Sequence, residues 1–221
     1  AETILRMPHD YVCYGPPENA PAVGRLPAKS RGYVTFGCFN NPMKYGNACL
    51  ALWSRVLKAI PRSRLLLKFG GLDQNSAQES LVARFAANGI APERLQIEGG
   101  VAHGELLASY QRVDLALDTL PYSGGLTTCE ALWMGVPVLT IPGTTLAGRH
   151  SISHLMNAGL GQFVARDADH FVELATGWAQ RLDELADLRS EMREMVRRSP
   201  LCDAEQCAAD FCRLLLEQAA K

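Results

Sequence analysis

One stretch of the sequence combines a flexible turn, hydroxyl side chains and a carboxylate at spacings that can hold a phosphorylated ligand. It covers residues 118–135 and begins where an apolar run that reads as a buried strand ends. Gly124 and Gly125 form a turn whose backbone can approach a ligand closely. Thr127 or Thr128 can cap the helix that follows. Free amides and the positive end of the helix dipole then make the turn an anion site.

A carboxylate lies one turn inside that helix. Glu130 can accept hydrogen bonds from the hydroxyls of a sugar, so the turn and the helix together predict a site for a phosphate and a ribose. The site uses neither a Walker motif nor a Gly-x-Gly-x-x-Gly fingerprint. The structural alternative is an ordinary connection between a strand and a helix, which also needs small residues.

A second loop, residues 39–44, can bring a cation to the same place. Asn40 and Asn41 suit a tight turn after the first predicted strand. Lys44 follows at the start of the next helix, so its ammonium group can reach the crevice of the glycine turn. A lysine opposite a helix start would hold a diphosphate from both sides and neutralise charge on a leaving phosphate. The alternative is a surface lysine beside a turn.

Two histidines have a spacing that can chelate a metal. His150 and His154 lie four residues apart on a predicted helix. No third ligand is evident in the sequence, so we predict no metal site. The sequence also contains no nucleophile elbow of the kind that serine hydrolases use.

Alternating strands and helices must position these residues. Short apolar strands are separated by amphipathic helices and short turns, which predicts a Rossmann-like α/β fold, a parallel sheet with helices on both faces. Ligands of such sheets bind beyond the carboxyl ends of the strands, where Asn40 and Tyr122 fall. The predicted strands are residues 33–39, 64–69, 95–97, 113–118, 136–141 and 162–165, and the predicted helices are 48–60, 77–88, 104–111 and 147–158, together with the helix after the glycine turn.

The start of the chain lies outside this alternation. Residues 1–32 contain several prolines and predict an extended connector with little tendency to form a helix. We expect this connector to follow an upstream lobe, so that the chain is the downstream part of a longer polypeptide. Residues 33–199 form the predicted lobe.

The tail of the chain is predicted to be helical. Apolar residues recur at helical spacing over 169–182 and 188–198. Asp203 and Gln206 form a capping box that begins the last helix, 204–218. We expect this C-terminal segment, residues 200–221, to pack back on the lobe.

The composition argues against several classes of function. A net charge of -1 over 221 residues gives no indication of nucleic acid or an acidic lipid surface as a partner. A hydrophobic content of 48% and a charged content of 20% are typical of soluble globular proteins. The sequence contains no apolar run long enough to span a bilayer and no signal peptide. Its seven scattered cysteines lack a Cys-x-x-Cys motif, which favours a reducing compartment, and we predict a cytoplasmic location.

Several motifs together resemble a known family. They are similar to the bacterial branch of the O-GlcNAc transferase family, glycosyltransferase family 41, with its SPINDLY-like relatives. The resemblance runs in order over nearly the whole chain and corresponds to the C-terminal, donor-binding lobe of a two-lobed GT-B catalytic region. The motifs are FNNxxK at 39–44, LLLKF at 65–69, DTxPYxGGxTTCEALWMGVP at 118–137, LAxR at 146–149 and SPL at 199–201.

The resemblance implies a reaction and its partners. The reaction is an inverting transfer of a sugar from a nucleotide diphosphate sugar, usually UDP-GlcNAc, to a serine or threonine of a protein, with no metal or other cofactor. The implied partners are the donor, the protein acceptor, and an N-terminal lobe and TPR helices upstream in the same polypeptide. Nucleic acid and membranes are not expected. The general base and the acceptor groove are expected mainly outside these residues, so we expect the isolated chain to be incomplete and inactive.

The resemblance also assigns roles to residues. Lys44 is similar to the catalytic lysine that stabilises the departing diphosphate, and Glu130 to the acidic residue on the ribose. The amides at the start of the central helix correspond to the phosphate site, and residues 101–103 to the loop that reads the base. The implied donor-binding residues are Asn41, Ala102, His103, Gly124, Gly125, Leu126, Thr127, Thr128, Glu130 and Arg149.

Four positions depart from the family pattern. Leu126 stands where many relatives have threonine, and Leu106 where relatives often have histidine. Gly125 replaces the histidine of the animal enzymes, and Gly148 replaces a serine before Arg149. Two alternatives therefore remain beside a UDP-GlcNAc transferase. One is a GDP-fucose-dependent protein O-fucosyltransferase on the same fold, and the other is a non-catalytic lobe that binds a nucleotide or a partner.

Overall fold

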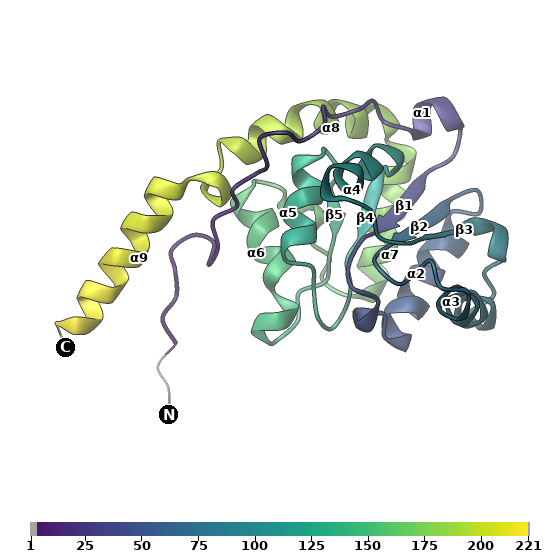
Figure 1. Cartoon of the computed structure of the whole chain (residues 1–221), viewed down its shortest axis with the longest axis horizontal. Coiled ribbons are helices and arrows are strands. Elements are labelled where there is room, and N and C mark those ends of the chain that lie inside the picture. Colours follow the sequence, from purple (N-terminus) through teal and green to yellow (C-terminus); the bar gives the residue numbers. More distant parts are fainter. Residues whose placement is uncertain (1–3, 221) are drawn as a thin grey trace.

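A parallel sheet of five strands forms the centre of the part of the chain that the computed structural model describes, residues 4–220. The strand order is β3-β2-β1-β4-β5, and each neighbouring pair is parallel. The order reverses between β1 and β4, so the connections after these two strands leave on opposite faces and open a crevice at their carboxyl ends. The strands are β1 (Thr35–Cys38), β2 (Arg64–Lys68), β3 (Leu95–Glu98), β4 (Leu115–Leu117) and β5 (Val138–Leu139) (Figure 1).

Helices cover both faces of the sheet, which confirms the predicted Rossmann-like α/β fold. On one face α2 packs against α3 and α7, and on the other α5 packs against α6 and α8. The connections through α2 and α5 run in opposite directions along the sheet, and right-handed crossovers therefore place these two helices on opposite faces. The helices are α1 (Ala28–Arg31), α2 (Asn47–Ala59), α3 (Asn75–Ala87), α4 (His103–Ser109), α5 (Leu126–Trp133), α6 (His150–Asn157), α7 (Ala168–Gln180), α8 (Leu182–Arg197) and α9 (Ala204–Ala219).

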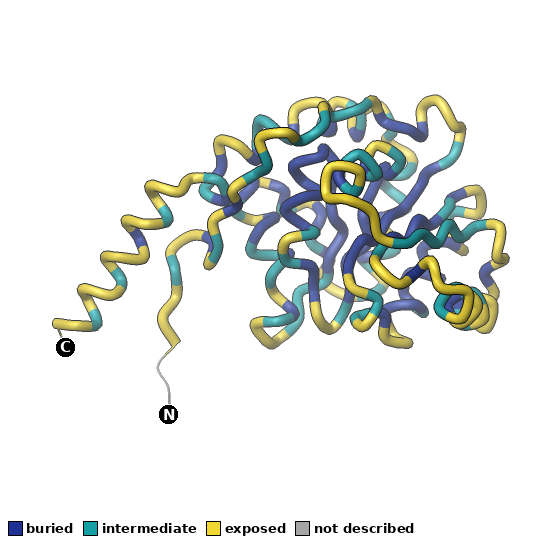
Figure 2. The backbone as a smooth tube through the Cα atoms, viewed as in Figure 1, coloured by how far each residue is buried: buried dark blue, intermediate teal, exposed yellow. Residues whose placement is uncertain are grey.

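The core lies between the sheet and its two helical layers (Figure 2). Leu65, Leu66 and Leu67 of β2 are completely buried, as expected for a strand covered on both faces. Trp53 of α2 is also completely buried and donates a hydrogen bond to the carbonyl oxygen of Asp118 at 3.2 Å. Each such side chain stabilises the fold by about 1.5–3 kcal/mol relative to an exposed position.

The N-terminal segment packs on the lobe over much of its length. Leu26 and Ala28 are buried, and the amide of Tyr14 donates to the carbonyl oxygen of Leu201 at 2.7 Å. The expectation of little helix is wrong at one point, since α1 forms there. Pro27 stands directly before α1 with φ -64°, which suits a helix start, and Gly32 ends it in the left-handed conformation. Residues 1–3 of the predicted connector, and residue 221 at the other end, lie outside the described residues.

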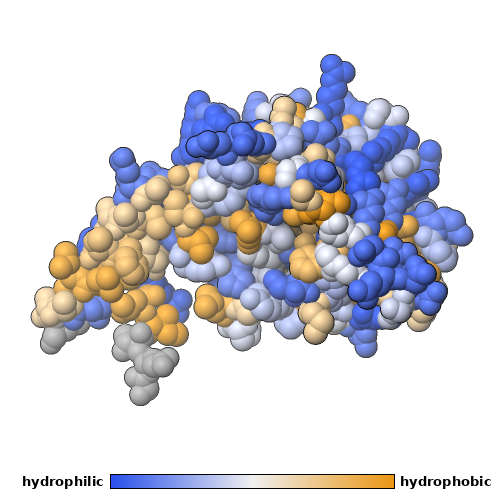
Figure 3. All heavy atoms as spheres, in the orientation of Figure 1, coloured by the Kyte–Doolittle hydropathy of each residue, from blue (hydrophilic) through white to orange (hydrophobic). Residues whose placement is uncertain are grey.

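The last helix differs from the expectation that it packs back on the lobe. In Figure 1, α9 extends away from the body of the molecule and lies near the N-terminal segment. Asp210 is the one residue among those described in α9 that is buried. Phe211, Leu215 and Leu216 are exposed, and Figure 3 shows apolar surface along this helix. The apolar positions of α9 therefore predicted a helix correctly but did not determine where it packs.

Three element boundaries also differ from the predicted ones. The predicted strand at 162–165 is a 3₁₀ helix, Gly161–Phe163, followed by a single bridge between Val164 and Thr140. The predicted helix at 147–158 begins at His150, after a 3₁₀ turn. Helix α8 begins at Leu182 rather than at 188, because Asp183 and Glu184 suit a first helical turn.

All seven cysteines lie in the described part of the chain and are free, and Cys38, Cys49 and Cys129 are buried. None of the helices described is both long enough and apolar enough to cross a bilayer.

Candidate functional site

The loops after β1 and β4 meet the start of α5 around a cavity of about 360 Å³ at the carboxyl edge of the sheet. This position agrees with the switch in strand order between β1 and β4. The cavity brings together residues from both loops that the sequence singled out. Its lining residues are Tyr11, Asn40, Asn41, Lys44, Phe69, Tyr122, Gly125, Leu126, Thr127 and His150.

Lys44 is held at one wall of this cavity. It ends a 3₁₀ helix that Asn41 caps, since the Asn41 side chain accepts from the amide of Met43 at 2.9 Å. The Lys44 ammonium donates to the carbonyl oxygen of Ser123 at 2.9 Å and lies 3.8 Å from the centre of the Tyr122 ring. Partial burial lowers the pKa of Lys44, and the nearby Asp118 carboxylate opposes this effect. Lys44 therefore differs from a freely solvated surface lysine.

A buried carboxylate fixes the glycine turn opposite Lys44. Asp118 accepts hydrogen bonds from the amides of Thr119 at 2.8 Å and Gly124 at 2.7 Å, and from the Thr140 hydroxyl at 2.7 Å. Burial raises the pKa of Asp118, and these hydrogen bonds oppose the rise. A Cβ on Gly124 would lie 2.5 Å from the hydroxyl oxygen of Thr128, so the turn requires glycine at this position.

The threonines after the turn do not cap α5 as predicted. The Thr127 hydroxyl donates to the side-chain oxygen of Asn40, and the Thr128 hydroxyl is 2.8 Å from that of Ser151. Gly125 is the N-cap, and no side chain among the described residues caps the helix. The prediction was wrong because both hydroxyls find partners that are distant in sequence, Asn40 on the β1 loop and Ser151 in α6. Asn40 thereby ties the β1 loop to the start of α5.

The start of α5 consequently offers open amides to the cavity. Within the described part of the chain, the N–H groups of Gly125, Leu126 and Thr127 donate no hydrogen bond. Uncapped amides and the helix dipole together attract anions. No carboxylate is among the residues that line the cavity, and Lys44 adds a positive charge. The arrangement can hold a phosphorylated group between a cation and a helix start.

Glu130 of α5 and His103 of α4 form a pair. Their Oε1 and Nε2 atoms are 2.7 Å apart, which joins α5 to the start of α4. Glu130 is buried, while the His103 side chain is 56% exposed. Burial raises the pKa of Glu130, and the hydrogen bond and charge of His103 oppose the rise. The structure thus joins the predicted ribose residue to the predicted base loop.

Six of the ten predicted donor-binding residues do not line the cavity: Ala102, His103, Gly124, Thr128, Glu130 and Arg149. Ala102 is exposed at the N-cap of α4. Arg149 is exposed and donates to the carbonyl oxygen of Gly143 at 3.3 Å. Its loop nevertheless touches the glycine turn, since a Cβ on Gly148 would lie 2.7 Å from the carbonyl oxygen of Pro121. That close approach accounts for a glycine before Arg149.

Sequence reasoning did not place Tyr11 or His150 at this cavity, although both line it. Tyr11 comes from the N-terminal segment, and its hydroxyl bonds His150 across 139 positions of sequence. No local pattern signals such a contact. His154, the other histidine of the possible chelate, instead bonds Asp10. No group of three or more His, Cys, Asp or Glu side chains among the described residues is arranged to hold a metal ion.

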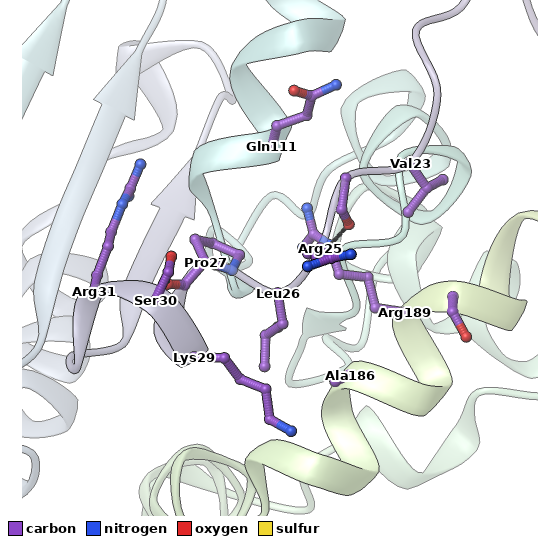
Figure 4. Close-up of a pocket in the computed structure, with 12 residues that line it drawn as sticks. Val23, Arg25, Leu26, Pro27, Lys29, Ser30, Arg31, Gln111, Ala186 and Arg189 are labelled. Atoms are coloured by element: carbon purple, nitrogen blue, oxygen red, sulfur yellow. Dashed lines mark hydrogen bonds between the residues drawn. The ribbon is translucent and has the colours of Figure 1, made fainter.

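A larger cavity, of about 750 Å³, lies at the opposite edge of the sheet (Figure 4). Residues 23–31 form one side of it and α8 the other, with Arg25, Lys29, Arg31 and Arg189 contributing positive charge. Arg189 is buried and donates to the carbonyl oxygens of three residues, Gly24, Tyr110 and Val113. Lys29 pairs with Asp183, and Arg31 donates to the carbonyl oxygen of Arg112. Lys29, Arg31 and Arg189 therefore hold the N-terminal segment on the lobe, and their hydrogen bonds stabilise the fold.

Comparison with known proteins gives consistent results. The model of Glycosyl transferase family 41 matches residues 24–211. Two relatives, from Petunia hybrida and Solanum lycopersicum, are each 37% identical to this chain. Both are named probable UDP-N-acetylglucosamine--peptide N-acetylglucosaminyltransferase SPINDLY, and the matches cover 93% and 91% of this chain, respectively. A solved structure of a Thermobaculum terrenum O-GlcNAc transferase mutant superimposes with a TM-score of 0.85 at 37% identity, covering 98% of this chain and 42% of that one. The chain spans 22% of the length of the two SPINDLY relatives.

Proposed function

This chain belongs to glycosyltransferase family 41, and from that premise we propose that it is the donor-binding lobe of a glycosyltransferase that uses a nucleotide diphosphate sugar. The observation that carries the proposal is the cavity at the carboxyl edge of the sheet. Lys44 stands on one side of it and the open amides of α5 on the other. A diphosphate needs positive charge on both sides, and no carboxylate lines this cavity.

In the proposed reaction, the acceptor hydroxyl oxygen forms a bond to the anomeric carbon of the sugar as the bond between that carbon and the distal phosphate oxygen breaks. The hydroxyl proton passes to the general base expected outside these residues. Negative charge then grows on the departing diphosphate. Lys44 and the amides of Gly125, Leu126 and Thr127 are already oriented, so they stabilise this charge without reorganisation. The Lys44 ammonium has further hydrogens to donate beside the one it gives to Ser123, and partial exclusion of water strengthens its interaction with an anion.

The nucleoside part is proposed to extend from the start of α5 towards α4. Glu130 would accept hydrogen bonds from the ribose hydroxyls, and the His103 ring would hold its carboxylate in place. Residues 101–103 would provide backbone groups for the base. Val101 is 42% exposed, so this loop is accessible to a ligand.

The donor and acceptor are proposed from the relatives. The relatives are named as UDP-N-acetylglucosamine--peptide N-acetylglucosaminyltransferases, which supports UDP-GlcNAc as the donor and a protein as the acceptor. The chain covers a small part of those relatives, which agrees with an upstream N-terminal lobe and TPR helices in the same polypeptide. The free cysteines agree with a cytoplasmic location, which remains a prediction.

A thermal-shift titration tests the proposal. Purified chain is heated with UDP, UDP-GlcNAc, GDP or pyrophosphate, beside the Lys44→Met variant. A ligand at one hundred times its dissociation constant stabilises the folded state by about 2.7 kcal/mol. We expect UDP and UDP-GlcNAc to raise the midpoint in the wild type and to act more weakly on the variant. An unchanged midpoint with every nucleotide, or equal shifts in both proteins, would contradict the proposal.

A further inference from the structure

A short N-terminal strap, residues 10–14, is fixed to helix α6 next to the cavity. Asp10 Oδ2 lies 2.7 Å from His154 Nδ1, and the two side chains are 0% and 1% exposed. The strap is also bonded at its other end, where the Tyr14 amide donates to the carbonyl oxygen of Leu201. A buried pair of this kind is costly to break from one side, so it holds the strap in register with α6.

The strap carries Tyr11 into contact with His150. The Tyr11 hydroxyl bonds His150 Nδ1, and the Tyr11 ring stacks on His154 with centroids 5.9 Å apart. Burial and the nearby Asp10 carboxylate raise the pKa of Tyr11 to about 12, so the phenol keeps its proton at neutral pH. Tyr11 is therefore the donor and His150 Nδ1 the acceptor.

This hydrogen bond determines where His150 carries its proton. Burial lowers the pKa of His150, His154 and Lys44 lower it further, and Asp10 opposes them. His150 is therefore neutral, and with Nδ1 accepting, its proton lies on Nε2. That Nε2–H has no hydrogen-bond partner within residues 4–220.

The His150 ring is held from several sides. Its amide donates to the Ser123 hydroxyl at 3.0 Å, and its ring lies 5.7 Å from the ring of Tyr122. Tyr122 is the ring on which the Lys44 ammonium rests. His150 and Lys44 line the same cavity. A fixed neutral donor without a partner therefore stands beside the cation proposed to bind the diphosphate.

We propose that His150 is a ligand-contacting residue whose Nε2–H donates to a phosphate oxygen of the bound diphosphate, and that Tyr11 is a positioning residue that fixes the His150 tautomer. This inference rests on the proposed function of the cavity. It extends the site to two residues that neither the glycine turn nor the Lys44 loop contains. It also links the N-terminal segment to ligand binding, because the anchored strap supplies Tyr11.

Calorimetric binding of UDP, pyrophosphate and uridine tests the role of His150. We expect His150→Leu to weaken UDP and pyrophosphate binding by about tenfold, the effect of a lost hydrogen bond to a charged group, and to leave uridine binding unchanged. His150→Gln places an amide donor near the Nε2 position and should restore much of the affinity. His170→Leu changes a half-buried histidine on α7 that does not line the cavity; it is the matched control and should bind all three ligands like the wild type.

A spectroscopic measurement tests Tyr11 independently. Nitrogen chemical shifts of His150 should report the Nε2–H tautomer in the wild type and a mixture of tautomers in Tyr11→Phe. The same variant should bind pyrophosphate several-fold more weakly, because only part of the population presents the donor. A role in packing alone would not change the tautomer.

The outcomes separate this inference from the proposed function. If the wild type binds UDP, Lys44→Met binds it weakly, and His150→Leu binds UDP and pyrophosphate like the wild type, then the inference about His150 is wrong and the proposed function stands. Equal loss of uridine and pyrophosphate binding in His150→Leu would also overturn it, since that pattern indicates a fold defect. If the wild type binds none of the three ligands, the proposed function itself fails.

Discussion

The two cavities at opposite edges of the sheet differ in how their hydrogen-bond donors are used. The larger one has a volume of about 750 Å³ and four cationic side chains, yet the donors of its buried arginine are bonded to backbone carbonyls. The smaller one has a volume of about 360 Å³, and the amides at the start of α5 and the inferred Nε2–H of His150 have no partner among residues 4–220. We therefore expect open donors, rather than volume or the number of charges, to mark the ligand site in this fold.

The two cavities differ in their donors because they lie at opposite ends of the parallel strands. At the carboxyl edge, the first residues of α5 line the cavity, and no acceptor among the described residues satisfies their amides. At the amino edge, carbonyl groups of the loops before the strands face α8, and Arg189 satisfies them. Burial lowers the pKa of Arg189 to about 10, and the nearby Asp114 carboxylate opposes this shift, so the guanidinium remains charged at neutral pH.

The largest expected effect is on stability, at the larger cavity. Arg189→Met leaves three carbonyl oxygens without their donor, each worth about 1 kcal/mol or more. We expect the free energy of unfolding to fall by about 3 kcal/mol, measured by urea denaturation, while UDP affinity of the folded fraction is unchanged. A loss of nucleotide binding without a loss of stability would reverse the assignment of the two cavities.

The next effect is on catalysis, at the smaller cavity. In an enzyme that also contains the upstream lobe, Lys44→Met should lower turnover about a hundredfold, as expected when one preorganised charge-stabilising group is lost. Steady-state transfer from a labelled donor measures this. Stability should barely change, because the Lys44 side chain is only partly buried. Turnover equal to that of the wild type would show that Lys44 is a surface lysine.

A smaller effect tests the nucleoside end of the site. Glu130→Gln should weaken UDP binding by about tenfold through the loss of a charged hydrogen bond, and should leave pyrophosphate binding unchanged because pyrophosphate has no ribose. Calorimetric titration of both ligands gives the comparison. Equal weakening of both would indicate that Glu130 supports the fold through His103 and does not contact the ribose.

The smallest effect is expected at the exposed cation of the larger cavity. Arg25 makes no hydrogen bond or ion pair with any described residue. Arg25→Ala should therefore change both the free energy of unfolding and UDP affinity by less than about 0.5 kcal/mol. It is the matched control for Lys44→Met, since each removes one cation from one cavity. A marked loss of anion affinity in Arg25→Ala would give the larger cavity a binding role.

Much of this site could be predicted from local sequence. A buried apolar strand, two glycines and a helix start lie next to one another in the chain, and Lys44 follows the neighbouring strand, so topology alone brings them together. The capping role of Thr127 was wrong because Asn40, far away in sequence, takes its hydroxyl. Contacts between distant segments leave no periodic signal in either segment.

The N-terminal segment illustrates the same limit. Its prolines predicted an extended chain, which Figure 1 shows, but nothing in its pattern indicated that Tyr11 reaches His150. The buried pair of Asp10 and His154 had no signal in the sequence either, since aspartate is usually exposed and histidine is intermediate. In helix α9, by contrast, the spacing of the apolar residues correctly predicts a helix. The spacing does not indicate which part of the molecule covers these residues.

The central claim is that the nucleotide sugar binds at the carboxyl edge of the sheet, and amide chemical shifts during a UDP titration test it most directly. Each backbone N–H reports its own surroundings, so one experiment compares both cavities. We predict that the amides of Gly125, Leu126 and Thr127 shift most and saturate together, while those of residues 23–31 stay unchanged. Saturable shifts confined to residues 23–31 and α8, with the start of α5 unaffected, would contradict the account.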